Sequence, residues 1–257
     1  MRALIGHTGF VGSNLRRAGG FDSMFNSSNY RDMAGQRFAE VVCAGVAAAK
    51  WVANSAPEAD RAAIAALTDV LSQAHIGRFV LVSTIDVYPD PAMAVDETFD
   101  PAGQPNHAYG TNRLALEKWV AARHPDHLIV RLPALFGPGL RKNALFDLLH
   151  DNSVEKINPA GRFQFYPVKR LAMDIATAAA VDLRLVNLFT EPVAMSTIIE
   201  RQFPDAPVGP ASTPAPDYHL TTRHGRLFGG DDRYVLSGDA VLASIADFVS
   251  EERARLR

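Results

Sequence analysis

The sequence is poor in cysteine, in net charge and in long apolar runs. Its 257 residues include one cysteine, Cys43, so no intrachain disulfide can form and a reducing compartment is expected. The 26 basic and 28 acidic side chains leave a formal net charge of −2, which excludes nucleic-acid binding through bulk positive charge. No apolar run approaches the roughly 20 residues that a membrane span needs, and the stretch after Met1 is too short for a signal peptide. We therefore expect a cytoplasmic protein with neither a nucleic-acid nor a membrane partner.

Paired metal ligands are also lacking. The eight histidines show no spacing typical of a metal site, so no metal is expected. The hydrophobic share of 47% and the charged share of 21% are those of an ordinary globular chain and exclude a disordered one.

The first half of the chain alternates short apolar runs with helical patterns. Strands are predicted at residues 2–6, 22–26, 40–44, 79–84 and 127–132, and helices at 9–18, 56–74 and 109–123. This alternation predicts βαβ units and a parallel sheet. The low polarity of 40–44 and 79–84 is typical of strands covered on both faces.

The second half is less regular. We expect a helix at 171–183, a strand at 185–189 and a closing helix at 239–255 with Asp239 as its N-cap, while the prolines between 204 and 216 predict an extended loop. The whole chain is predicted to be one α/β unit. A Rossmann-type doubly wound parallel sheet would occupy residues 1–132, with a small substrate-binding region over 133–257 packed closely against it.

A glycine-rich turn follows the first strand and opens the first helix. Glycines at such a turn let backbone amides approach a pyrophosphate, and the helix N-terminus adds partial positive charge. The pattern predicts a dinucleotide site, although a tight turn without a ligand has the same glycines. The residues expected at the cofactor are Gly6, Thr8, Gly9, Phe10, Val11 and Gly12.

A polar segment follows the second strand, where NAD-binding folds carry an acidic residue. This chain has Ser27, Asn29 and Arg31 there. Hydroxyl, amide and guanidinium groups favour the 2′-phosphate of NADP over the free ribose of NAD, so we expect an NAD(P) cofactor with a preference for NADP. The alternative, that this is only a polar turn, stays open.

Hydroxyl groups end the clearest buried strand, at Ser83 and Thr84. Side chains at the carboxyl ends of parallel strands point into a ligand crevice. Downstream, Tyr109 and Arg113 are four residues apart and share one helical face, where a cation favours a phenolate. The alternative is that Tyr109 and Arg113 only pack this helix.

Together these segments resemble the extended, or atypical, short-chain dehydrogenase/reductase family of the NAD-dependent epimerase/dehydratase type. The resemblance implies that Thr84 holds the reacting oxygen and that Tyr109 is the general acid/base. The family has lysine where this chain has Arg113, which keeps the charge but donates in a fixed fork. The resemblance also places further residues near the cofactor or the substrate, namely Cys43, Ala44, Gly45, Ser83 and Pro133 for the former and Asn143 for the latter.

The substrate is harder to read from the sequence. Asp86, two residues after Thr84, is a candidate substrate-binding residue. The family's 4,6-dehydratases have Asp-Glu directly after the threonine, so the resemblance implies that Ile85-Asp86 in this chain favours an epimerase or a reductase. Arg162 is a candidate for a substrate diphosphate, with a solvated surface position as the alternative. Cys43 is expected to be a small buried residue rather than a reactive thiol.

We therefore predict an NAD(P)-dependent oxidoreductase or epimerase acting on a nucleotide sugar or a similar hydroxylated carbonyl compound. The family resemblance also suggests a homodimer formed through the Tyr109 helix. The alternative is an NAD(P)-binding regulator or scaffold without turnover, which the arginine at position 113 favours.

Overall fold

The structure is a computed structural model that describes residues 1–256. Two compact units divide the chain. Unit 1 contains residues 1–89, 99–131 and 172–186, and unit 2 contains residues 90–98, 132–171 and the chain from 187 onward. The chain therefore passes between the units several times, and the boundary predicted after residue 132 lies next to one of these crossings.

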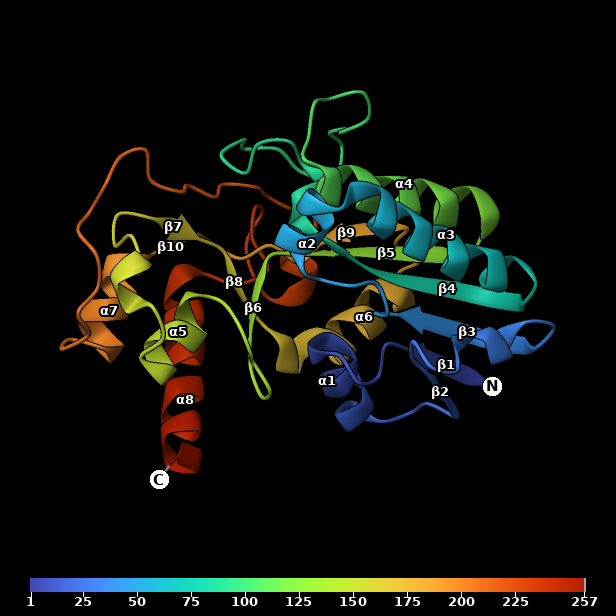
Figure 1. Cartoon of the computed structure of the whole chain (residues 1–257), viewed down its shortest axis with the longest axis horizontal. Helices are drawn as coiled ribbons and strands as arrows, with labels where there is room; N and C mark the ends of the chain where they lie inside the picture. The colour runs from blue at the N-terminus through green and yellow to red at the C-terminus, as the bar shows by residue number, and fades with distance from the viewer. Residues whose placement is uncertain (257) are drawn as a thin grey trace. The chain divides into compact units, whose positions relative to one another are not determined.

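A six-stranded parallel sheet runs through unit 1 in the order β2-β1-β3-β4-β5-β9 (Figure 1). Its strands are β1 (Arg2–Ile5), β2 (Ser23–Phe25), β3 (Arg37–Cys43), β4 (His75–Thr84), β5 (His127–Leu132) and β9 (Leu185–Asn187). The chain places β2 on one side of β1 and then β3 on the other, so the direction of winding reverses between β1 and β3. The doubly wound α/β fold predicted from the alternating pattern is confirmed.

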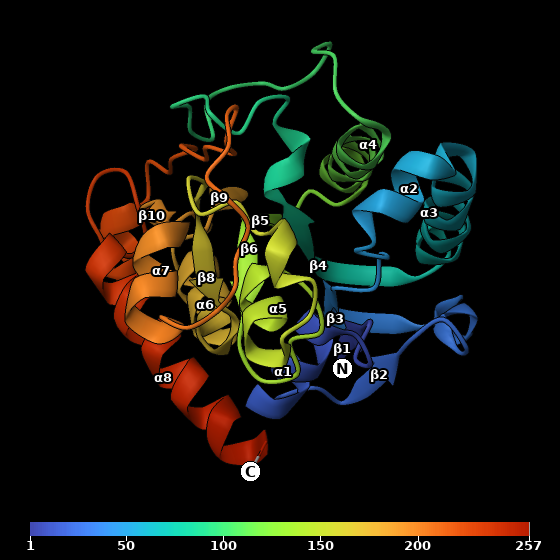
Figure 2. The ribbon, with the colours of Figure 1, turned by 60° about the vertical axis from the view of Figure 1, so that its left-hand side comes forward.

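Helices cover the sheet of unit 1. They are α1 (Phe10–Ala18), α2 (Lys50–Ser55), α3 (Pro57–Ser72), α4 (Ala108–Arg123) and α6 (Leu171–Ala180), with short 3-10 turns η1 (Tyr30–Met33) and η2 (Ile85–Val87). Figures 1 and 2 both show α2, α3 and α4 together on one face of the sheet, with α1 on the other. Leu116 and Val120 stand one turn apart on α4 and are buried with Phe79 of the sheet. Each such side chain contributes roughly 1.5–3 kcal/mol by leaving water.

A buried ion pair ties α4 to the sheet. Arg131 of β5 donates to Glu117 of α4 at 2.6 Å, and each side chain is 4% exposed. Ser83 donates to the same carboxylate at 2.5 Å, and Arg131 also donates to the Tyr88 hydroxyl at 2.9 Å. Because every charge in this cluster has a partner, it orients α4 without leaving an unpaired charge in the core.

Unit 2 is built from short elements around its own core. The strands are β6 (Ala134–Phe136), β7 (Arg162–Phe163), β8 (Phe165–Pro167) and β10 (Val193–Ala194), and the helices are α5 (Ala144–His150), α7 (Met195–Gln202) and α8 (Gly238–Leu256); 3-10 turns are η3 (Val154–Lys156), η4 (Val168–Arg170) and η5 (Gly225–Phe228). β6 pairs with β8 in parallel and β7 with β10 antiparallel. Leu145, Ile198 and Ile245, one from each helix, meet in the core with no exposed surface.

Segment 90–98 is tied to unit 2 by backbone hydrogen bonds from His219 and Thr221 to Pro91 and Val95, and by Glu97. The carboxylate of Glu97 accepts the backbone N–H of Asn187 at 2.7 Å, the hydroxyl of Thr222 at 2.6 Å and the backbone N–H of Arg223 at 3.0 Å. One side chain thus joins three parts of the chain that are far apart in sequence.

Some predicted boundaries were wrong. β3 begins at Arg37, not at residue 40, because the polar residue Arg37 pairs with His75 at the exposed start of the sheet. The helix predicted to reach residue 183 ends at Ala180. Asp239 is inside the first turn of α8 rather than its N-cap; the Ser237 hydroxyl accepts the Ala240 N–H at 3.3 Å instead.

The loop predicted from the prolines is confirmed, since residues 204–216 contain neither helix nor strand. The strand predicted at 185–189 is present but ends at Asn187. Within residues 1–256, no helix combines the length and the apolar character that crossing a membrane requires.

His124, at the end of α4, is packed among aromatic rings. Its ring centroid lies 4.8 Å from that of Phe79 and 5.5 Å from that of Trp119, and the residue is 5% exposed. Burial, with smaller effects from Arg123 and His127, lowers the pKa of His124 from 6.5 to about 4. The folded state therefore holds this imidazole neutral.

This burial predicts a pH dependence of stability. Above pH 6.5 the imidazole is neutral in both states, whereas between pH 6.5 and about 4 only the unfolded chain takes up the proton. Stability should therefore fall as pH falls through this window, by up to about 3 kcal/mol. His124→Gln cannot take up a proton in this range. Between the two ends of the window, its free energy of unfolding in urea should fall by about 3 kcal/mol less than that of the wild type. An identical pH dependence in both proteins would contradict the account.

Candidate active site

The carboxyl ends of β1, β3 and β4 lie at one edge of the sheet of unit 1. Parallel pairing sets Ile5 opposite Cys43 and Cys43 opposite Leu81, so β1 and β3 end level while β4 continues to Thr84. Winding reverses between β1 and β3, and in open α/β sheets ligands bind outside the strand ends at such a point. This edge is therefore where unit 1 is expected to hold a ligand.

The turn from β1 to α1 requires glycine at positions 6 and 12. Gly6 has a φ of +86°, and a Cβ built on it would lie 2.4 Å from the carbonyl oxygen of Ala44. A Cβ on Gly12 would lie 2.0 Å from the carbonyl oxygen of Gly6. A side chain at either position would force the turn away from the end of β3, so close backbone contact explains both glycines.

The N-terminus of α1 has no side-chain cap. Its N-cap residue is Gly9, and a Cβ there would meet only the carbonyl oxygen of Gly6, at 3.4 Å. Thr8 and Gly9 are exposed, and Phe10 and Val11 are half-buried. Uncapped N–H groups at the positive end of a helix suit an anionic group, so these residues fit the pyrophosphate of a dinucleotide.

The end of β3 offers backbone rather than side chains. A Cβ on Gly45 would lie 2.6 Å from the Ile5 side chain, which shows how closely this loop passes β1. Cys43 is 1% exposed, and burial raises the pKa of its thiol to about 11. The thiol is thus neutral and packed within the sheet, as a small buried residue. Only the backbone of residues 43–45 can face a ligand.

The segment after β2 is a polar turn held partly by its own side chains. Asn26 Oδ1 accepts the Ser28 N–H at 2.8 Å, and Asn29 Oδ1 accepts the Asn26 N–H at 2.7 Å. Asn29 therefore has a structural task, whereas the side chains of Ser27 and Arg31 are exposed.

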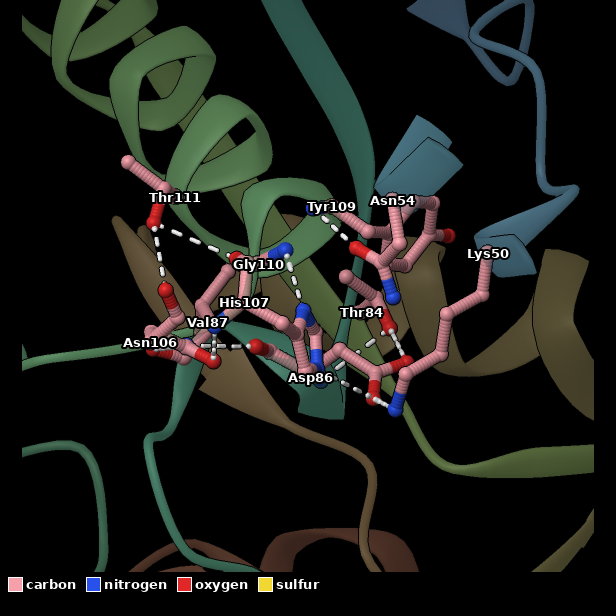
Figure 3. A network of polar contacts seen from close by, with 10 residues as sticks. All are labelled: Lys50, Asn54, Thr84, Asp86, Val87, Asn106, His107, Tyr109, Gly110 and Thr111. Atoms are coloured by element: carbon pink, nitrogen blue, oxygen red, sulfur yellow. Dashed lines mark hydrogen bonds and ion pairs between the residues drawn. The ribbon is translucent and has the colours of Figure 1, made fainter. Parts of the chain in front are cut away.

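A polar network joins the end of β4 to the start of α4 (Figure 3). The hydroxyl of Thr84 accepts the Asp86 N–H at 3.1 Å and donates to Asp86 Oδ2 at 3.1 Å. A Cβ on Gly110 would lie 2.1 Å from the Asp86 carbonyl oxygen, so α4 and η2 touch backbone to backbone. This close approach places Tyr109, at the start of α4, near the end of β4 that carries Thr84.

Three polar side chains fix the first turn of α4. His107 is the N-cap residue, and its Nδ1 accepts the Gly110 N–H at 3.0 Å. Asn54 Oδ1, from α2, accepts the Tyr109 N–H at 2.9 Å. Asn106 donates to two carbonyl oxygens of η2, at 2.9 and 3.2 Å. The backbone position of Tyr109 is therefore set from three directions.

Burial dominates the acidity of Tyr109, which is 7% exposed. Loss of hydration raises its pKa above the ordinary value, and the charge of Asp86 adds to this. Arg113 and the Thr84 hydroxyl lower the pKa of Tyr109 but do not cancel the effect of burial. Arg113 thus favours the phenolate, as expected, although the phenol is the resting form at neutral pH.

The sequence model of a family described as "NAD dependent epimerase/dehydratase family" matches residues 25–157, more than half of the chain. The chain belongs to this family. The predicted resemblance is confirmed, and the match includes Thr84, Tyr109 and Arg113, whereas the glycine-rich turn lies before it. No curated protein sequence matches the chain significantly.

Solved structures with the same fold include several family enzymes. The UDP-N-acetylglucosamine 4-epimerase of Methanobrevibacter ruminantium, in complex with UDP-N-acetylmuramic acid, superposes with a TM-score of 0.79 at 14% identity, over 99% of this chain and 98% of that one. The UDP-glucose 4-epimerase of Thermotoga maritima, with UDP-glucose, gives 0.76 at 14% identity over 100% of both chains. A dTDP-4-dehydrorhamnose reductase of Clostridium acetobutylicum gives 0.70 at 17% identity, over 98% and 100%. At these identities the likeness shows the fold.

Arg113, which stands where the family has lysine, is locked in place. Its guanidinium donates to both carboxylate oxygens of Asp60, at 2.8 and 3.0 Å, and to the carbonyl oxygen of Ala47 at 2.5 Å. Its Cζ lies 4.4 Å from the centroid of the Tyr109 ring, over the face of the ring. Burial acts to raise the pKa of Asp60, but hydrogen bonds from Arg113 and Asn112 hold it below its ordinary value. Arg113 is therefore an anchor between α4 and α3.

Ser83 does not face the predicted site. Although it precedes Thr84, the strand alternation turns its hydroxyl into the core, where it donates to Glu117. The expectation that Ser83 binds the cofactor is therefore not supported by its geometry.

Lys50 and His107 are site residues that the sequence analysis missed. Lys50 Nζ lies 2.5 Å from Asp86 Oδ1, and His107 Nε2 lies 3.5 Å from the same oxygen. No motif marks Lys50, because it reaches the site from α2, 34 positions before Thr84 in the chain. His107 could have been noticed as a polar residue immediately before the predicted helix.

The candidates in unit 2 have local roles. Pro133 is buried between β5 and β6. Asn143 caps α5, since its Oδ1 accepts the N–H groups of Leu145 and Phe146 at 3.0 and 3.1 Å. Arg162 is exposed on β7. Among residues 1–256, no three His, Cys, Asp or Glu side chains are arranged to hold a metal ion.

The role of Arg113 as an anchor gives a stability prediction. Arg113→Met leaves the Asp60 carboxylate, 9% exposed, without its partner, and this should cost about 3–5 kcal/mol in urea unfolding. Arg113→Met combined with Asp60→Asn should recover much of the loss, because the unpaired charge is gone. Equal stability of the wild type and Arg113→Met would show that the pair is not an anchor.

Proposed function

We propose that the protein is an NAD(P)-dependent epimerase or reductase acting on a nucleotide-linked sugar. The observation that carries the proposal is the backbone contact at Gly110, which sets Tyr109 of α4 near the end of β4 that carries Thr84. The same unit contains an uncapped glycine-rich helix N-terminus at the reversal of strand winding. A proton-transferring phenol and a dinucleotide site on one sheet edge are what such chemistry requires.

The chain's own residues would hold the cofactor by backbone contacts. The turn from Gly6 to Gly12 and the first N–H groups of α1 would bind the pyrophosphate, and the backbone at Ala44 and Gly45 would lie along the dinucleotide. When bound, a nicotinamide cofactor supplies hydride exchange at a substrate carbon. The protein contributes orientation and proton transfer.

Tyr109 would act as the general acid and base. In the oxidative direction its phenolate would take the proton of a substrate hydroxyl, and in the reductive direction its phenol would donate that proton to the forming alkoxide. Thr84 would hold the same oxygen. In the structure its own proton points to Asp86, so its oxygen is an acceptor until the hydroxyl rotates.

Nucleotide-linked sugars are the substrate class that fits best with the comparisons. The epimerases of similar fold carry a UDP-linked sugar in their structures, and the similar reductase is named for a dTDP-linked one. Arg162, exposed in unit 2, is our candidate for the substrate diphosphate. The apolar Ile85 after Thr84 favours an epimerase or reductase over a dehydratase.

Tyr109→Phe tests the proposal. With oxidised or reduced NAD(P) bound and a panel of UDP- and dTDP-sugars added, formation of the epimeric or reduced sugar, followed by chromatography, should be slower in this variant by a factor of about 10²–10⁴. Tyr234→Phe is the matched control, because Tyr234 is equally buried, at 7% exposure, and should keep wild-type rates. Unchanged turnover in Tyr109→Phe would remove Tyr109 from the mechanism.

A regulator or scaffold that binds NAD(P) without turnover is the second candidate. The observation that favours it is the locked Arg113, whose donors are taken by Asp60 and Ala47. The same assay separates the two functions: tight cofactor binding with neither an epimeric nor a reduced product from any sugar of the panel supports the regulator.

The choice of cofactor depends on the turn after β2. The exposed Arg31 and Ser27 and the absence of an acidic residue among 26–29 support a preference for NADP over NAD. We expect NADPH to bind more tightly than NADH in fluorescence titrations, and Arg31→Ala to weaken NADPH alone, by roughly tenfold. Tighter binding of NADH to the wild type would overturn the preference.

The cytoplasmic location and the homodimer formed through α4 stay predictions of the sequence analysis.

A further inference from the structure

The chain lacks a free cation at position 113. Arg113 is 4% exposed, and both terminal nitrogens of its guanidinium donate to Asp60 or Ala47. Its Cζ lies over the face of the Tyr109 ring, 4.4 Å from the ring centroid. A guanidinium held in this way can neither move towards a ligand nor follow a proton transfer at Tyr109.

A second cation reaches the same site from another helix. Lys50 is the first residue of α2, and its Nζ lies 2.5 Å from Asp86 Oδ1, while the side chain is 44% exposed. Figure 3 shows the Lys50 side chain extending from α2 to the Asp86 carboxylate, close to Thr84.

Asp86 connects Lys50 with the Thr84–Tyr109 pair. Its Oδ2 accepts the Thr84 hydroxyl at 3.1 Å, and its Oδ1 faces Lys50 and His107. The Asp86 charge also acts on Tyr109, where it disfavours the phenolate. Whatever balances the charge of Asp86 therefore affects how readily Tyr109 loses its proton, alongside the larger effects of burial and Arg113.

His107 does not supply that balance. Because its Nδ1 accepts the Gly110 N–H, the neutral ring carries its proton on Nε2, facing Asp86. Burial, followed by the charge of Lys50, lowers the pKa of His107, so the ring is neutral at neutral pH. The positive charge beside Asp86 comes from Lys50.

We propose that Lys50 is a positioning residue that compensates for the missing lysine at position 113: it neutralises Asp86 and holds the Thr84 hydroxyl, so that Tyr109 can release its proton. The catalytic meaning of this inference rests on the proposed function. The coupling between Lys50 and Tyr109 belongs to the protein itself and can be measured without a substrate.

The charged and titratable groups around Tyr109 come from every element packed on its helix turn. Lys50 comes from α2 and Asp60 from α3. Thr84 and Asp86 come from the end of β4 and from η2. His107 precedes Tyr109 as the N-cap of α4, and Arg113 follows it on the same helix. Glu117, further along α4, is neutralised by Arg131. Removing Lys50 leaves Asp86 uncompensated and should make Tyr109 less acidic.

The test is the titration of Tyr109 in cofactor-free protein without substrate. Ring-labelled tyrosine observed by carbon NMR gives one signal for each of the six tyrosines, and Tyr109→Phe identifies the signal of interest. Lys50→Met should lower the acidity of Tyr109 roughly tenfold. Lys50→Arg should keep the wild-type pKa of Tyr109. In the double variant Lys50→Met with Asp86→Asn, the pKa of Tyr109 should fall back to the wild-type value or below it, because the charge that Lys50 balances is absent.

Lys118→Met is the control, since Lys118 is an exposed lysine on α4 outside the network. If Lys50→Met titrates like the wild type and like Lys118→Met, the inference is overturned. It is also overturned if the double variant keeps the full effect of Lys50→Met. Circular dichroism checks that each variant is folded.

Turnover separates this inference from the proposed function. With an active nucleotide sugar, the pH profile of kcat for Lys50→Met should move to more alkaline pH, and Lys50→Arg should restore it. A shifted Tyr109 titration in a protein that turns over no sugar would support the coupling while refuting the proposed enzyme. An unshifted Tyr109 titration in a protein that turns over a sugar would refute the coupling while supporting the proposed enzyme.

Discussion

The arrangement of the candidate site depends on one backbone contact, between the first turn of α4 and η2. A Cβ on Gly110 would lie 2.1 Å from the Asp86 carbonyl oxygen, so only glycine lets the two segments come this close. The contact is fastened by Asn106, which donates to the carbonyl oxygens of η2, and by the His107 cap. It brings the end of a buried strand against the start of a helix and so joins Thr84 to Tyr109.

Charge is distributed around this contact in two separate pairs. Asp60 holds Arg113 on the far side of the Tyr109 ring, and Asp86 holds Lys50 near Thr84. The first pair is buried, whereas the Lys50 side chain is 44% exposed. The position where the family has lysine thus carries a buried arginine, and a partly exposed lysine reaches the Tyr109 region from α2.

The sequence predicts the fold of unit 1 well because its signals are local. Apolar runs and helical periodicity over more than ten residues identify β4 and α4, and the glycine-rich turn marks the end of β1. Unit 2 is predicted poorly because β6, β7, β8 and β10 are two or three residues long, too short for any period to show. Segment 90–98 is tied to unit 2 by Glu97 and by backbone hydrogen bonds, whose partners lie about 90 and more positions away in the chain.

In the candidate site, too, residues with a local sequence signal could be predicted, whereas those placed by contacts far apart in the chain could not. Thr84, Tyr109 and the glycine-rich turn follow from motifs, and the structure brings Thr84 and Tyr109 together. The orientation of Ser83 depends on which face of β4 it occupies, and that of Arg113 on Asp60 in α3, so neither could be read from spacing. Lys50 carries no motif at all, and only the folded chain places it beside Asp86.

In the proposed reaction, hydride leaves a sugar carbon while Tyr109 takes the proton of the oxygen on that carbon. The most direct measurement is mass spectrometry of cofactor and sugar after incubation with a nucleotide sugar deuterated at the carbon that is oxidised. In the wild type we expect deuterium on the nicotinamide ring or retained at the same carbon of an epimeric sugar, and far less of either in Tyr109→Phe. A wild-type protein that binds both cofactor and sugar, yet gives neither deuterated cofactor nor epimeric sugar, would contradict this mechanism.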